Sequence, residues 1–210
     1  MLLRNLSLLV ILLFILTGCA STPPLQTDGV YAVSMSENQD AFLGSAFRID
    51  ENYVATAAHV VGSLNYVHIG DTVGTVDYLD TIDDIAIVFV PKLSGTIYTS
   101  NIAVNNENAT AIGFVFADNK TLKIATSGQV GYTDADTIIY DGGTQVGMSG
   151  GPLFNLNGGV IGMVSGVASW HGIHPNPTMG IYVPSHKIEA ALRFVSSNKK
   201  KVVIPGEISE

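Results

Sequence analysis

The sequence predicts an all-β fold, and three observations lead to that expectation. Short runs rich in Val, Ile, Phe, Tyr and Thr recur along residues 29–181, and such side chains suit a pleated, half-buried strand. Turn signals such as Asp141-Gly-Gly143 and Asn157-Gly-Gly159 separate these runs. No helical stretch intervenes between them, and closely spaced strands without helices are typical of a sandwich or a barrel.

The expected strands follow one another from residue 30 to residue 183. They include Val30–Val33, Phe42–Ile49, Tyr53–Thr56, Asn65–Ile69, Ile85–Val90, Ala111–Phe116, Leu122–Ala125, Thr137–Tyr140, Gly159–Val164 and Gly180–Val183. One helix is expected after them, over Ser185–Ser197. Pro184 precedes this segment, Ser185 can cap its first turn, and apolar residues recur along it at helical spacing.

Composition limits the functional classes. The chain has 210 residues, of which 47% are hydrophobic and 13% charged, so it can bury a core and is not a disordered chain. The net charge is −8 and no basic stripe is present, which argues against a nucleic-acid partner. The short run Lys199–Lys201 is interpreted as a solvated helix end. Cys19 is the sole cysteine, so no intramolecular disulfide can form and packing must stabilise the domain.

The N-terminus has the pattern of a processing signal. Arg4 precedes an almost wholly apolar run over residues 6–16, which is short of the about 20 residues that a membrane-spanning helix needs. The run ends in Leu16-Thr-Gly-Cys19, which resembles the lipobox of bacterial lipoproteins. The resemblance implies cleavage before Cys19, lipidation of that cysteine and, with Ala20 next, sorting to the outer membrane facing the periplasm. An ordinary cleaved signal, with Cys19 incidental, is the alternative.

Three segments carry candidate catalytic residues. Ser149 lies in the run Gly-Met-Ser-Gly-Gly-Pro-Leu at residues 147–153, where the N–H groups of Gly147 and Ser149 can point at one developing oxyanion. His59 ends the run Thr-Ala-Ala-His and is the expected base. Asp84 opens Asp-Ile-Ala and can orient an imidazole. Taken singly, each also fits a plain turn or a solvent-facing side chain.

Together these segments resemble the chymotrypsin-like serine proteases, and most closely the HtrA/Deg-type protease domain. They occur in the order His, Asp, Ser, and Gly44–Phe47, Asn155–Gly162 and Gly180–Ser185 resemble further segments of that domain. The resemblance covers roughly residues 30–197. It implies two antiparallel β-barrels with a C-terminal helix, and a serine endopeptidase. The implied catalytic triad is His59, Asp84 and Ser149. The sequence departs from the family at Met148, where Asn is usual.

The same resemblance places the primary substrate pocket. Its expected lining is Gly143, Ser165, Gly166, Val167 and Gly180. None of these is acidic, so we expect cleavage after apolar residues and not after Lys or Arg. The implied partners are protein or peptide substrates, together with the membrane through the lipid anchor. No metal or organic cofactor is implied.

Two assignments have alternatives. Asp80 and Asp83 lie close to Asp84, which we favour because it directly precedes Ile-Ala and because alternation along a strand would turn Asp83 to the opposite face. His171 and His174 form a His-x-x-His pair that could bind a metal, but a loop that tunes substrate access is the favoured interpretation.

The expected organisation is a signal peptide over residues 1–18, a Pro-rich tether over 19–29, a protease domain over 30–198 and a tail over 199–210.

Three other functions fit parts of the pattern. A protease fold kept only for binding and a structural lipoprotein are two of them. The third is an α/β-hydrolase esterase, because residues 147–151 match Gly-x-Ser-x-Gly, although a strand run and not a helix follows Pro152.

Overall fold

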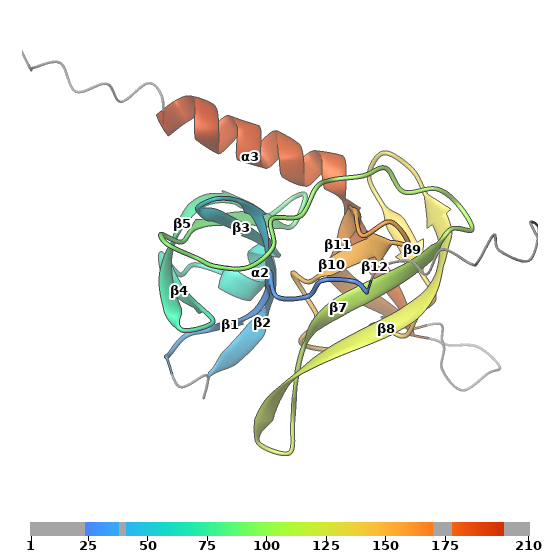
Figure 1. Ribbon diagram of the computed structural model, residues 1–210, viewed down its shortest axis with the longest axis horizontal. Helices are drawn as coiled ribbons and strands as arrows, with labels where there is room; N and C mark the ends of the chain where they lie inside the picture. Colours follow the sequence, from blue (N-terminus) through green and yellow to red (C-terminus); the bar gives the residue numbers. More distant parts are fainter. Residues whose placement is uncertain (1–23, 38–40, 170–177, 200–210) are drawn as a thin grey trace, which may run out of the picture.

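The structure is a computed structural model that describes residues 24–37, 41–169 and 178–199. These residues form two closed antiparallel β-barrels that lie next to each other, with a helix running across both (Figure 1). The two-barrel, all-β architecture expected from the sequence is therefore confirmed. None of the helices within the described ranges is long and apolar enough to cross a membrane.

The first barrel contains the first six strands. In order around the barrel they are β1 (Val30–Ser34), β2 (Phe42–Asp50), β3 (Tyr53–Thr56), β6 (Ile85–Phe89), β5 (Thr72–Asp80) and β4 (Tyr66–Ile69), and β4 pairs with β1 to close the ring. Every residue of β3 is buried, as are the first four of β6, so these two strands are the centre of this barrel. A four-residue helix, α2 (Ala58–Val61), follows β3 directly.

The second barrel contains the remaining six strands. Their order around it is β10 (Pro152–Asn155), β11 (Val160–Ser169), β12 (Thr178–Pro184), β9 (Ile138–Tyr140), β8 (Lys120–Thr133) and β7 (Asn108–Ala117), closed by β7 against β10. β7 and β8 form a long twisted hairpin that extends beyond the barrel (Figure 1). The second barrel has its own apolar core, which includes Met148 and Tyr182.

Helix α3 (Ser185–Lys199) fastens the two barrels together. It continues directly from β12 of the second barrel, and its buried side chains Ile188, Ala191 and Val195 belong to a core cluster that contains residues of both barrels. Full burial of an aliphatic side chain of this size stabilises a fold by about 1.5–3 kcal/mol. The helix expected over Ser185–Ser197 is thus present and extends two residues further.

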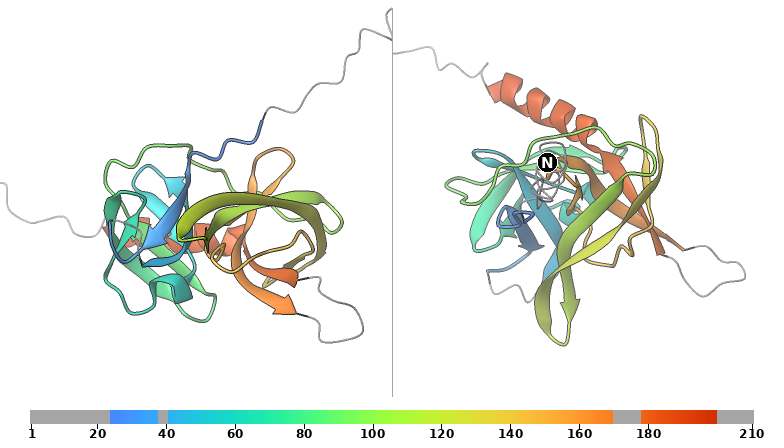
Figure 2. Two further views of the ribbon diagram at one scale, coloured as in Figure 1. Left: turned by 90° about the horizontal axis from the view of Figure 1, so that it is seen from below. Right: turned by 45° about the vertical axis from the view of Figure 1, so that its right-hand side comes forward.

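The segment before β1 is also part of the folded body. Tyr98, in the linker between the barrels, donates a hydrogen bond to the Gln26 carbonyl at 3.1 Å and accepts one from the Gly29 N–H at 3.2 Å. Lys123 of β8 donates to the Thr27 carbonyl at 2.8 Å. This segment lies at the junction of the barrels, where Figure 2 shows it in blue. The tether expected over residues 19–29 is therefore packed against the domain over residues 24–29, because both barrels supply partners for its backbone.

Candidate active site

His59 and Asp84 meet at one end of the first barrel. His59 is the second residue of α2, and its Nδ1 lies 3.0 and 2.9 Å from the two carboxylate oxygens of Asp84. The backbone N–H of His59 also donates to Asp84 Oδ1 at 3.0 Å, and the Ala58 N–H donates to the Asp84 carbonyl at 3.2 Å. Asp84 adopts the left-handed conformation with a φ of 55°, which is uncommon outside glycine. The first two residues of α2 therefore hold both the carboxylate and the backbone carbonyl of Asp84.

The neighbouring aspartates have different partners. Asp80 accepts hydrogen bonds from the N–H groups of Ile82 and Asp83 at 2.9 and 3.1 Å, and so closes the turn between β5 and β6. Asp83 forms an ion pair with Lys187. Residues 81–84 form this turn and are not part of a strand, so the alternation argument used to separate Asp83 from Asp84 was wrong. The turn separates the two carboxylates instead, and Asp84 is the one that contacts His59.

Ser165 contributes a contact that the sequence did not reveal. Its hydroxyl donates to Asp84 Oδ2 at 2.5 Å, across the boundary between the barrels. Ser165 lies where the pairing of β11 with β12 shifts register, between Val164 and Gly166. Ser165 was also expected to line the substrate pocket, and its hydroxyl holds the second carboxylate oxygen of Asp84.

Electrostatics favour a carboxylate facing a protonated Nδ1. Burial raises the pKa of Asp84, but the hydrogen bonds from His59 and Ser165 outweigh burial, and the net pKa lies below its ordinary value. The hydrogen bond to Asp84 raises the pKa of His59 above its ordinary 6.5, against a smaller lowering by burial. The carboxylate therefore selects the neutral tautomer with hydrogen on Nδ1, which leaves Nε2 as the free base. The His59 side chain is 50% exposed and so is open to a reaction partner.

The loop that carries Ser149 is shaped by two glycines. Gly147 and Gly150 have φ angles of 97° and 82°, values that side chains disfavour. Between them Met148 is fully buried in the core of the second barrel. Met148, the residue that departs from the family pattern, therefore anchors the loop by packing into the core of the second barrel. Within the described residues, neither the Gly147 N–H nor the Ser149 N–H donates to a protein acceptor, which is the state that an oxyanion donor requires.

Ser45 fastens this loop to the first barrel. It is completely buried in β2, and its hydroxyl donates to the Gly147 carbonyl at 3.0 Å while accepting from the Phe114 N–H at 2.8 Å. Its backbone N–H donates to the Ser149 carbonyl at 2.8 Å. One residue thus holds the carbonyl groups of the residues before and after Met148. The sequence showed Ser45 only as part of a matching segment, and a contact 102 residues apart in the chain leaves no local pattern.

These contacts bring the Ser149 loop against the segment that carries His59. A Cβ atom added at Gly150 would lie 2.9 Å from the Ala57 nitrogen, and one added at Gly44 would lie 2.9 Å from the Ser149 carbonyl and 2.7 Å from a Val60 methyl. Ala57 and Val60 are neighbours of His59 in and beside α2. The structure therefore places the three residues expected to form the triad at the boundary between the barrels, with Ser149 on the second and the other two on the first.

The residues expected to line the substrate pocket lie on the second barrel. Val167 and Gly180 are paired partners in β11 and β12, and Val167 is partly exposed. At Gly143 and Gly166 an added Cβ would meet nothing within 4 Å, so the space beside both is open. Gly180 packs against Thr144, whose hydroxyl forms a buried hydrogen bond of 2.7 Å with the Tyr182 hydroxyl.

Several expected features lie outside the described residues. They are the lipidation site Cys19 and the loop histidines His171 and His174. Over the ranges that the structure does describe, no group of three or more His, Cys, Asp or Glu side chains is arranged to hold a metal ion.

The first barrel carries a His–Asp pair, and the second carries a serine loop that packs against it. This arrangement defines the class of chymotrypsin-like, serine-type peptidases. Residues 44–163 match the family model described as trypsin-like peptidase domain, and the chain belongs to that family.

Known relatives agree with this assignment. The serine protease Rv3671c of Mycobacterium tuberculosis is 32% identical over an alignment of 148 residues, which covers 62% of this chain and 37% of that protein. Non-structural polyprotein 1A of Ovine astrovirus 1 is 29% identical over 149 residues, 69% of this chain and 17% of that protein. The chain thus spans little more than a third of the serine protease and a smaller share of the polyprotein.

Solved structures show the same fold. The active form of the Rv3671c protease from M. tuberculosis superposes with a TM-score of 0.63 at 26% identity, covering 84% of this chain and 82% of that chain. The HtrA-type protease AlgW with a decapeptide gives a TM-score of 0.64 at 20% identity, covering 82% and 65%. A serine endoprotease from Yersinia pestis gives 0.65 at 19% identity, covering 81% and 64%.

Proposed function

We propose that this chain is a serine endopeptidase that hydrolyses peptide bonds through an acyl-enzyme on Ser149. One observation carries the proposal: the Asp84 carboxylate holds the proton-bearing Nδ1 of His59 beside the loop on which Ser149 lies. This arrangement leaves His59 Nε2 free to accept the Ser149 proton.

The reaction runs in two halves. Ser149 Oγ attacks the scissile carbonyl as its proton passes to His59 Nε2, and the C–O bond forms while the carbonyl oxygen becomes an oxyanion. The N–H groups of Gly147 and Ser149 stabilise that oxyanion, typically by about 2.7–4 kcal/mol for each donor. His59 then gives its proton to the leaving amine as the C–N bond breaks. Water repeats the sequence on the ester, releases the acid and restores the Ser149 hydroxyl.

The substrates follow from the pocket and the proposed location. Gly143, at the expected base of the pocket, offers neither an acid nor bulk, and Val167 is apolar, so residues with apolar side chains fit before the cleaved bond. We propose that proteins of the cell envelope are cut. The basis is the sequence Leu16-Thr-Gly-Cys19, which we take as a lipidation site that anchors the enzyme in the outer membrane, facing the periplasm.

The first test is labelling of the full chain, purified in detergent, with a fluorophosphonate probe. We expect one probe per molecule on Ser149, and no labelling of Ser149→Ala or His59→Ala. A folded wild-type chain that takes up no probe would indicate a catalytically silent protein that uses the fold for binding. A peptide library with varied residues before the cleaved bond then measures specificity, and preferred cleavage after Lys or Arg would contradict the pocket assignment.

The anchor is tested separately. Cells expressing the wild-type chain are grown with a labelled fatty acid and fractionated, next to cells expressing Cys19→Ser. We expect label on the wild-type protein in the outer-membrane fraction and none on the variant. Label-free protein in the soluble periplasm would contradict the anchor while leaving the peptidase proposal intact.

A further inference from the structure

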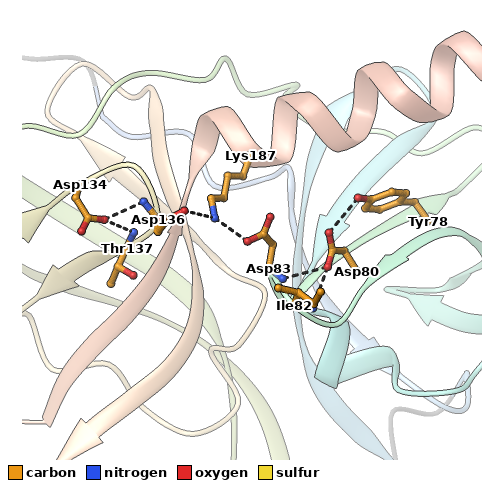
Figure 3. Close-up of polar contacts among 8 residues, drawn as sticks. All are labelled: Tyr78, Asp80, Ile82, Asp83, Asp134, Asp136, Thr137 and Lys187. Atoms are coloured by element: carbon orange, nitrogen blue, oxygen red, sulfur yellow. Dashed lines mark hydrogen bonds and ion pairs between the residues drawn. The ribbon is translucent and has the colours of Figure 1, made fainter.

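Lys187 joins the two barrels beside the proposed active site. Its ammonium nitrogen lies 2.6 Å from Asp83 Oδ1 and 2.7 Å from Asp136 Oδ1. Asp83 belongs to the turn between β5 and β6 of the first barrel, and Asp136 to the turn between β8 and β9 of the second. Figure 3 shows the lysine reaching from the start of α3 into the space between these two turns.

Both turns are held rigidly on their own side. The Asp134 carboxylate accepts hydrogen bonds from the N–H groups of Asp136 and Thr137, each at 2.8 Å. The Asp80 carboxylate does the same for the opposite turn and in addition accepts a hydrogen bond from the Tyr78 hydroxyl at 3.2 Å (Figure 3). Lys187 therefore connects two turns whose backbones are already held by hydrogen bonds of their own.

The base of the lysine is fixed as well. Ser185, two residues before it, donates its hydroxyl proton to the Asn101 carbonyl at 2.5 Å. The helix continues from β12, and β12 pairs with β11, the strand that carries Ser165. Lys187 and Ser165 thus belong to one continuous part of the second barrel.

Two consecutive residues of the first barrel contact this part. Asp83 binds Lys187, and Asp84 accepts the hydrogen bond of Ser165. Asp84 must hold a left-handed backbone while its carboxylate meets His59 on one side and Ser165 on the other. A turn held at Asp83 leaves the next residue little freedom to leave that position.

The burial of the pair makes it more than a surface contact. The Lys187 side chain is 18% exposed and Asp83 is 37% exposed, whereas Asp136 is 77% exposed. Exposed pairs contribute little, and screening by salt weakens them further. The contact with Asp83 is therefore better shielded from solvent and salt than the contact with Asp136. The two carboxylates raise the pKa of Lys187, so it stays charged throughout the range in which a peptidase of this class works.

We propose that Lys187 is a positioning residue for the active site, which holds the turn over residues 81–84 so that Asp84 meets His59 and Ser165 together. This inference rests on the proposed peptidase function. Lys187 touches neither the substrate nor a reacting atom in this role, and it acts through Asp83.

The test compares Lys187→Met with Lys187→Arg in the full chain. Misplacement of a catalytic group by about 1 Å can lower a rate about 100-fold, and we expect Lys187→Met to lower kcat and the labelling rate of Ser149 about tenfold, with KM within about twofold. Lys187→Arg keeps the charge and should recover most of the rate. Arg193→Met is the matched control, because Arg193 forms an ion pair with Glu189 on the same helix without contacting the turn.

A proton NMR measurement gives a readout that does not depend on turnover. The Nδ1 proton of His59 in its hydrogen bond with Asp84 should give a low-field signal in the wild type and in Arg193→Met. We expect the signal to broaden or move upfield in Lys187→Met. If Lys187→Met does not fold, Asp83→Ala replaces it, since that side chain is partly exposed and lies in a turn.

The outcomes separate this inference from the proposed function. A wild-type enzyme that labels, with Lys187→Met equal to it in rate and in NMR signal, would overturn the positioning role alone. A loss of thermal stability in Lys187→Met with an unchanged rate per folded molecule would also overturn it. A wild-type chain that does not label would remove the proposed function, and the NMR comparison would still decide whether Lys187 orders the His59–Asp84 pair.

Discussion

Replacing Ser45 with alanine removes one hydroxyl from the boundary between the barrels and almost no volume. Two partly buried groups then lose their partner, the Gly147 carbonyl and the Phe114 N–H. The backbone bond from Ser45 to the Ser149 carbonyl survives, since it does not use the side chain. The variant therefore tests the hydrogen bonds that hold the oxyanion loop, without opening a cavity.

The magnitude follows from the burial of this site. Ser45 is completely buried, and an unsatisfied buried donor or acceptor destabilises a fold by about 1–3 kcal/mol. Because both groups are only partly buried, each falls in the lower part of this range, and if the loop keeps its conformation the free energy of unfolding falls by about 2–4 kcal/mol for the two together. If the Gly147–Met148 peptide turns to find another partner, the backbone angles of Gly147 change and its N–H leaves the position that the oxyanion site requires. A shift of about 2 kcal/mol against the competent conformation lowers the reactive fraction about 30-fold.

The assay is the rate of fluorophosphonate labelling, measured beside a urea unfolding curve. We expect Ser45→Ala to label roughly ten- to a hundredfold more slowly than the wild type at equal folded fraction. Ser34→Ala is the matched control: Ser34 is equally buried in the same barrel, and its hydroxyl donates to the Ser36 carbonyl, away from the loop. Wild-type labelling by Ser45→Ala, with the same unfolding midpoint, would refute the reasoning.

Three further outcomes are expected. His59 must lose its proton to act as a base, and the hydrogen bond to Asp84 raises the pKa of His59 above 6.5. We therefore expect kcat/KM to rise with pH through a midpoint above 6.5. Asp84→Asn should move that midpoint to lower pH and reduce kcat about 10⁴-fold, and an unmoved midpoint in a pH–rate profile would contradict the pairing. Gly147→Ala should abolish labelling while circular dichroism stays native, because a Cβ there would lie 2.8 Å from the Phe114 carbonyl at a φ of 97°; full labelling would show that this conformation is not required. Met148→Ala should lower the free energy of unfolding by about 2–5 kcal/mol in urea, and no change would show that Met148 does not support the core.

The strands that the sequence predicted are those with strongly apolar runs. Ile85–Phe89 and Tyr53–Thr56 were found because they are buried on both faces. Strand β5 was missed, since Thr72–Asp80 is only partly buried along most of its length and contains Gly74, which makes room for Val88. Strand β8 was expected over four residues and extends over fourteen, because pairing with β7 supports a largely exposed, polar segment that has no apolar pattern.

In the candidate site, too, some residues were predicted from the sequence and others were not. We could identify His59, Asp84 and Ser149 from the sequence because each lies in a recognisable local motif. Ser45 and Lys187 did not stand out, because their partners lie about a hundred residues away and a hydroxyl or an ammonium group carries no periodicity. Such contacts depend on how the barrels dock, which local sequence patterns do not describe.

The docked segment over residues 24–29 also sets an order of folding events. Its partners Thr96, Tyr98 and Lys123 lie 68 to 96 residues further along the chain. During synthesis this segment emerges before these partners, so its contacts with the linker and the β7–β8 hairpin form only after both have been made. Contacts of such high sequence separation form late, because a long loop must close first. Residues 24–29, the described part of the chain nearest the expected anchor, are thus among the last to dock. Once they have docked, both barrels of the domain are already formed.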